Sequence, residues 1–62
     1  MPMGGHEYGF VLDGKLTVEV DGQSYSLGKG DLISYSSRAR HRIRNHGKRP
    51  ARTLWFNLAS RP

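Results

Sequence analysis

Residues 30–45 of the chain read GDLISYSSRARHRIRN. Residues 32–35 are a short run with apolar, β-branched and aromatic side chains, which is typical of a strand. In residues 41–45 arginines alternate with histidine, isoleucine and asparagine, so a strand would place the arginines together on one face. A helix over residues 36–49 would have only Ala39 and Ile43 as apolar side chains, which is too little to anchor it. The stretch therefore predicts two strands connected by a turn.

The same pattern extends over the rest of the chain. Side chains alternate with a period of two in several other segments, which predicts strands over residues 8–12, 16–20, 23–27 and 52–58. Asp13-Gly14 and Asp21-Gly22 separate the first of these, and Asp-Gly indicates a tight hairpin because glycine adopts a positive φ without strain. Residues 28–31 predict a further turn and residues 46–50 a loop. Short strands with regular turns indicate one all-β domain, a sandwich or a barrel.

The chain has 62 residues and no cysteine. A chain of this length buries only about 60% of its unfolded surface, so a monomer is marginally stable. Without disulfides, the remaining stability must come from a metal, a partner chain or self-association. We expect self-association, because the edges of open sheets need to be paired or covered.

Charge is distributed unevenly between the two halves. Residues 1–31 contain five acids and two lysines, a net charge of −3, whereas residues 32–62 contain eight basic residues and no acid, a net charge of +8. A basic half of this kind can attract nucleic acid, anionic ligands or an acidic protein surface. The interpretation that we favour is a solvated strand face that balances the acidic half of a neighbouring subunit. Tyr8 to Val11 partly resemble the aromatic strand of RNA-recognition modules, but Asp13 beside such a platform would repel phosphate.

Several other classes of protein find no support in the sequence. No segment reaches the roughly 20 apolar residues of a membrane-spanning helix. Residues 1–7 have neither the basic flank nor the apolar stretch of a signal peptide. We therefore expect a cytoplasmic protein without membrane contact. The serines lack a G-x-S-x-G nucleophile motif, and there is no P-loop or dinucleotide-binding fingerprint.

Two segments resemble the conserved motifs of the cupin superfamily. Residues 30–45 match the spacing of the second cupin motif, G(X)5PXG(X)2H(X)3N, with Gly30, His41 and Asn45 in register. Ser36 replaces the proline of that motif, and Arg38 replaces its second glycine. Residues 7–14, EYGFVLDG, resemble the end of the first motif, E(X)6G. The chain is thus similar to a single cupin-like domain over residues 1–62.

The resemblance implies a small antiparallel β-barrel of jelly-roll type. The early strands of a full cupin are missing, so the chain is either a fragment of a longer protein or a minimal cupin. We expect a barrel that is truncated at the N-terminus and completed by dimerisation. The segments VLDG (11–14), GKGD (28–31) and RTLWFN (52–57) are similar to the C-terminal cupin domains of helix-turn-helix transcriptional regulators. The resemblance therefore implies a domain that binds small molecules, with nucleic acid bound only through a DNA-binding part that is missing here.

The resemblance also assigns candidate site residues. Glu7 and His41 occupy metal-ligand positions of the family, and Arg38 and Tyr35 are further candidates for contact with a ligand. A catalytic metal generally has three protein ligands. The two histidines of the first cupin motif would fall on Met1 and Met3 or before the start of the chain. Glu7 and His41 are thus an incomplete set for the divalent transition metal that the family implies.

Both residues also have metal-free interpretations. His41 would then form a hydrogen bond with Glu7 or with a backbone carbonyl, and Glu7 would meet one of the arginines. His6 should point to the opposite face of its strand from Glu7. We expect a ligand-binding sensor domain rather than an enzyme, and the alternative is a small metal-dependent isomerase or dioxygenase.

The last predicted strand carries apolar residues on both faces. Leu54, Phe56 and Leu58 share one face and Trp55 lies on the other. We expect the leucine and phenylalanine side to fill the barrel and Trp55 to face a partner subunit.

Overall fold

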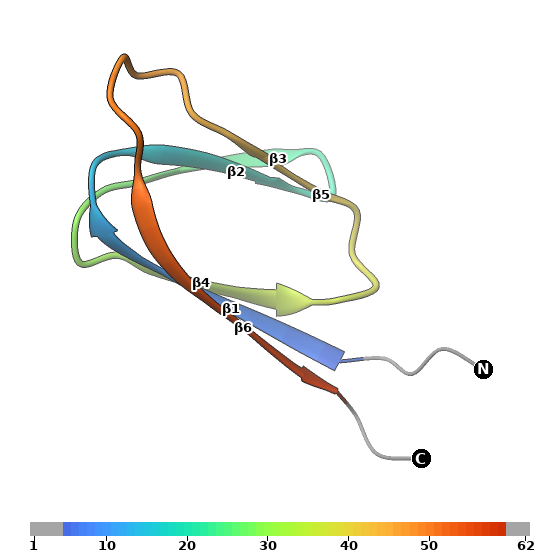
Figure 1. Ribbon diagram of the computed structural model, residues 1–62. Helices are drawn as coiled ribbons and strands as arrows, with labels where there is room; N and C mark the ends of the chain where they lie inside the picture. Colours follow the sequence, from blue (N-terminus) through green and yellow to red (C-terminus); the bar gives the residue numbers. More distant parts are fainter. Residues whose placement is uncertain (1–4, 60–62) are drawn as a thin grey trace.

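The computed structural model describes residues 5–59, which form six strands (Figure 1). Each strand that the sequence predicts is present, and the prediction of an all-β fold is confirmed. The strands are β1 (Gly5–Asp13), β2 (Leu16–Val20), β3 (Gln23–Leu27), β4 (Leu32–Ser36), β5 (His41–Arg44) and β6 (Arg52–Ala59).

The six strands form two antiparallel sheets of three strands each. The first sheet has the order β4-β1-β6, and the second has the order β3-β2-β5. Figure 1 shows the two sheets as opposite layers, with long connections that pass from one layer to the other. Each sheet is therefore held together by two strand pairings, and its central strand, β1 or β2, takes part in both.

The turn at Asp21-Gly22 is the tight hairpin that the sequence predicts. Val20 pairs with Gln23, so two residues connect β2 to β3. Both have a positive φ, 49° at Asp21 and 84° at Gly22, as a type I′ turn requires. The Asp21 carboxylate also accepts a hydrogen bond of 3.1 Å from the backbone N–H of Arg40, which ties the hairpin to the beginning of β5.

The prediction of a second hairpin at Asp13-Gly14 is wrong. β1 and β2 belong to different sheets, so the chain turns a corner here and does not double back. The pairing of β1 with β6 shifts between Val11 and Asp13, and such a bulge bends a strand. Gly14 then has a φ of 89°, and a Cβ at this position would lie 3.0 Å from Cα of Ala51. Asp-Gly signals a positive φ, but it does not determine which strands pair.

The core lies between the inner faces of the two sheets. Within residues 5–59, the buried hydrophobic side chains are Val11, Leu16, Val18 and Tyr35. The packed cluster adds partly buried residues from both layers: Val20, Leu27, Ile33, Ala51 and Trp55. This core is small, as expected for a chain of this length.

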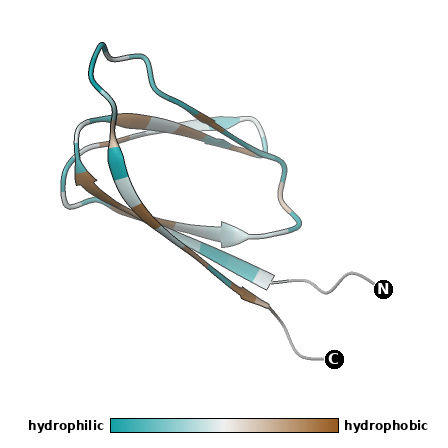
Figure 2. Ribbon diagram, in the orientation of Figure 1, coloured by the Kyte–Doolittle hydropathy of each residue, from teal (hydrophilic) through white to brown (hydrophobic). Residues whose placement is uncertain are grey.

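The expectation that Trp55 faces outward is wrong. Trp55 packs against the core cluster, whereas Leu54, Phe56 and Leu58 are 47%, 55% and 62% exposed on the other side of β6. Both faces of β6 carry large apolar or aromatic side chains, so alternation alone does not identify its inner side. Figure 2 shows the hydrophobic segments of β6 and of the end of β1 in the same sheet, whereas the loop that leads from β5 to β6 is hydrophilic.

Residues 5–59 contain no helix that could span a membrane.

Candidate functional site

Glu7 lies at the centre of a polar cluster on the inner face of the first sheet. In the register of the sheet, Glu7 pairs with Tyr35 of β4 on one side and with Asn57 of β6 on the other. Directly paired residues present their side chains next to each other on one face. The Tyr35 hydroxyl donates a hydrogen bond of 3.2 Å to Oε1 of Glu7, and Nδ2 of Asn57 donates one of 3.4 Å to Oε2.

Trp55 supplies a third donor to the same carboxylate. Its Nε1–H donates a hydrogen bond of 3.2 Å to Oε1 of Glu7. Trp55 pairs with Gly9, and a Cβ on Gly9 would lie 2.5 Å from the indole ring. The absence of a side chain at Gly9 therefore lets the indole lie across β1 and reach Glu7. Within the described residues, the carboxylate of Glu7 thus accepts hydrogen bonds from three neutral donors.

Tyr35 links this cluster to the second sheet. It is 6% exposed, and its ring centroid lies 4.9 Å from that of His41 on β5. Burial raises the pKa of Tyr35 above its ordinary value of 10.0; the neighbouring charge of Glu7 acts in the same direction, whereas hydrogen bonding from Trp55 opposes it. The phenol is therefore neutral at pH 7, and its hydroxyl donates a hydrogen bond to Glu7.

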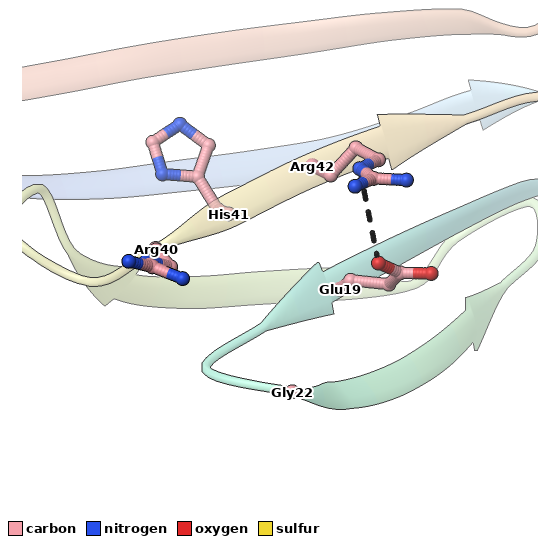
Figure 3. A pocket seen from close by; sticks show the side chains of 5 residues that line it. All are labelled: Glu19, Gly22, Arg40, His41 and Arg42. Atoms are coloured by element: carbon pink, nitrogen blue, oxygen red, sulfur yellow. Dashed lines mark ion pairs between the residues drawn. The ribbon is translucent and has the colours of Figure 1, made fainter.

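His41 lies at the exposed end of this series of side chains. Its Nδ1 lies 3.0 Å from the carbonyl oxygen of Ala39, and this contact orients the ring and leaves Nε2 as the outward nitrogen. Val20 is its pairing neighbour in β2, so the ring points toward the interior side of the second sheet. In Figure 3 the imidazole of His41 points away from the ion pair between Arg42 and Glu19.

The arginines of β5 lie on the opposite, outer face, as strand alternation predicts. Arg42 and Arg44 approach the Glu19 carboxylate, with N–O distances of 4.0 Å and 3.7 Å. An open hollow of about 250 Å³ lies at this edge and is lined by Glu19, Gly22, Arg40, His41 and Arg42 (Figure 3). These side chains are partly or fully solvated, so the ion pairs contribute little to stability.

Arg38 lies in the turn between β4 and β5 and is exposed. Its backbone N–H donates a hydrogen bond of 3.2 Å to Oγ of Ser36. The structure thus brings Glu7, Tyr35 and His41 into one series of contacts, and it places Arg38 in the turn that leads to His41.

The residues described here do not fit the metal centre that the cupin fold implies. Within residues 5–59, no three side chains of His, Cys, Asp or Glu lie close enough together to hold a metal ion. The oxygens of Glu7 instead accept hydrogen bonds from Tyr35, Trp55 and Asn57. Met1 and Met3, the two further candidates, lie outside the described residues.

The cluster combines one charged acceptor with polar and aromatic neighbours. Glu7 offers a carboxylate to the hydroxyl or amine groups of a ligand, and the amide of Asn57 also approaches Oγ of Ser37 at 3.3 Å. Tyr35, Trp55 and His41 provide flat surfaces against which an apolar or aromatic body can pack. Apolar and aromatic side chains around a few polar groups are typical of sites for small organic molecules.

Sequence reasoning missed Trp55 and Asn57 as members of this cluster. The two residues are separated by one position, so they share a face of β6, and that signal was available in the sequence. The missing information was the neighbour of β6, because only the register with β1 places Asn57 opposite Glu7.

Comparison with known families agrees with this architecture. The family model described as "Cupin domain" matches residues 4–57. The chain therefore belongs to the cupin family, and its two sheets form a cupin-type domain for the binding of small molecules.

One curated relative gives further context. The tetracenomycin polyketide synthase protein TcmJ of Streptomyces glaucescens is 34% identical over 58 residues, which cover 90% of this chain. The match covers 39% of TcmJ, so the chain spans well under half the length of that relative. No solved structure gives a significant match.

Proposed function

We propose that this cupin domain binds a hydroxylated, partly aromatic small molecule between its two sheets, with Glu7 as the central acceptor. The observation that carries the proposal is the inward-facing carboxylate of Glu7, surrounded by Tyr35, Trp55 and Asn57. A ligand hydroxyl can replace one of these neutral donors without leaving the carboxylate unsatisfied. Hydrogen bonds to charged groups contribute more to binding than neutral ones, about 1.5–3 kcal/mol each. The similarity to a tetracenomycin polyketide synthase protein supports a ligand related to polyketides.

The binding proposal is tested with Trp55 as the reporter. Trp55 is the single tryptophan of the chain, so its indole N–H gives one resonance in a proton–nitrogen correlation spectrum. We expect dihydroxynaphthalene, used as the probe, to shift this resonance in a saturable way, and naphthalene without hydroxyls to bind more weakly. Glu7→Gln keeps the size of the side chain and removes its charge, and it should raise the Kd by roughly 10-fold.

Glu19→Gln is the matched control for this experiment. It removes a carboxylate from the outer face of the second sheet, where Glu19 contacts Arg42 and Arg44. The Kd of the probe should be unchanged in this variant. Equal binding by Glu7→Gln and wild type, or no response of the Trp55 resonance to the hydroxylated probe, would refute the proposal.

We further propose that the domain is the effector-binding part of a transcriptional regulator. The support is the similarity of residues 11–14, 28–31 and 52–57 to the cupin domains of helix-turn-helix regulators. The DNA-binding part would then lie outside residues 1–62, on the same polypeptide or on a partner. Chromatin immunoprecipitation of the native protein should enrich particular promoter regions, and enrichment no greater than that of a control antibody would contradict this role.

Metal analysis distinguishes this proposal from a small metal-dependent enzyme. The binding function needs no metal, and we expect mass spectrometry of protein purified without a His-tag to find less than one transition metal per chain. Nearly one metal per chain, lost in His41→Ala, would favour the enzyme and contradict a metal-free site.

A further inference from the structure

The outer face of the first sheet is apolar across all three of its strands. We define the apolar face as Tyr8, Phe10, Leu32, Leu54, Phe56 and Leu58. The pairing register joins these side chains: Phe10 lies between Leu32 and Leu54, and Tyr8 lies beside Phe56. Neighbours of this kind on one side of a sheet form a continuous surface.

Much of this face is in contact with solvent in the single chain. Leu32 is 63% exposed, and the three members from β6 are 47%, 55% and 62% exposed. Within residues 5–59, four hydrophobic side chains are buried, whereas seven large ones are exposed, four of which belong to the apolar face. Contiguous apolar patches on this scale mark protein–protein contacts.

The outer face of the second sheet has the opposite character. Its outward positions carry Thr17, Glu19, Ser24, Ser26, Arg42 and Arg44. On the apolar face, the outward positions of residues 6–10, 32–36 and 54–58 carry no aspartate, glutamate, lysine or arginine. The two sheets therefore differ in what they can bury, and only the first has an outer face that can be desolvated at low cost.

We propose that the apolar face is the interface of a homodimer, with a second copy of this chain as its occupant. The chain has a net charge of +5, so two copies repel each other if they meet through the arginines of the second sheet. Contact through the apolar face avoids that repulsion and keeps both basic faces in solvent. Leucines flank Phe10 on both sides, so the face can pack on itself about a two-fold axis, as a symmetric dimer requires.

A stable dimer requires only a limited share of the surface of the chain. A standard interface takes about 800 Å² from each partner. The chain exposes 4923 Å² in total, so such an interface would cover about one-sixth of it. Burial of the face also supplies the apolar contacts that the small core lacks.

The test is the oligomeric state of the 62-residue chain by sedimentation equilibrium. We expect the wild type to have twice the mass of the 7.0 kDa chain. Leu32→Lys on β4 and Phe56→Lys on β6 place a charge at opposite edges of the apolar face. Each should raise the dimer Kd by at least about 30-fold. The matched control, Ser26→Lys, adds the same charge to the outer face of the second sheet and should leave the dimer Kd nearly unchanged.

Two further measurements verify that the variants are folded and that the dimer contact is apolar. Circular dichroism verifies that each lysine variant is folded, and Leu32→Ser is the milder alternative if Leu32→Lys is not. Sulfate should strengthen the wild-type dimer, because excluded salts favour apolar burial. A wild type that stays monomeric overturns the proposal and leaves the face to a different partner. Equal weakening by Ser26→Lys, or an unchanged dimer Kd in both variants of the face, also overturns it.

Discussion

Tyr35 shows how one side chain connects the core to the candidate site. It is buried, its ring contacts His41, and its hydroxyl donates to Glu7. The same residue therefore belongs to the packing between the sheets and to the polar cluster. A substitution that keeps the ring and removes the hydroxyl separates these two roles.

Tyr35→Phe should destabilise the domain at neutral pH by about 1–2 kcal/mol, because Glu7 loses one donor. The difference should shrink above pH 10. The folded-state pKa of Tyr35 is raised above 10.0, so the folded state binds this proton more tightly than the unfolded state does. The free energy of unfolding of the wild type must then fall as the pH rises above 10.0 toward the folded-state pKa. Urea unfolding of both proteins between pH 7 and pH 11 measures this difference, and a constant gap would contradict the assignment.

Among the structural elements, the strands were predictable and their partners were not. The period of two and the Asp-Gly turns are local signals, so they locate six strands. Pairing depends on contacts distant in sequence, because β1 lies between β4 and β6. For this reason the local signal at Asp13-Gly14 predicts a hairpin, although the structure has a corner between two sheets there.

The candidate site was partly predictable for the same reason. Glu7 and His41 follow from the spacing of the cupin motifs, which is a property of the sequence. Asn57 and Trp55 join Glu7 only through the register of β6 on β1. Alternation does not predict the orientation of Trp55, because both sides of β6 carry large apolar or aromatic side chains.

The β2–β3 hairpin offers a test of turn geometry in isolation. Gly22 has a φ of 84°, and a Cβ at this position would have no atom within 4 Å. Gly22→Ala should therefore destabilise the domain by about 1–2 kcal/mol through backbone strain alone. Gly22→Asn is the matched control, because asparagine tolerates a positive φ, and it should lose less than half as much. Thermal unfolding of the three proteins measures the effect, and equal losses for both variants would show that strain at Gly22 is not the cause.

At the scale of the whole molecule, the inner and outer faces of the two sheets have different roles. Their inner faces share one small core and the polar cluster, whereas their outer faces are apolar on one side and basic on the other. A chain with this distribution places its ligand site inside the domain and its apolar surface outside it. The candidate site is therefore built within one chain, and the apolar face remains available for association.

The proposed dimer links the stability of the domain to its concentration. If the apolar face is buried between two copies, folding and association are coupled, and the Tm must rise with protein concentration by mass action. Scanning calorimetry of the wild type at increasing concentrations should show this rise. Leu32→Lys should have a lower Tm that no longer depends on concentration, since its exposed position leaves the contacts within one chain largely intact. A concentration-independent Tm in the wild type would mean that the core of Leu16, Val18 and Tyr35 is sufficient for a stable single chain, and that the apolar face contributes nothing to folding.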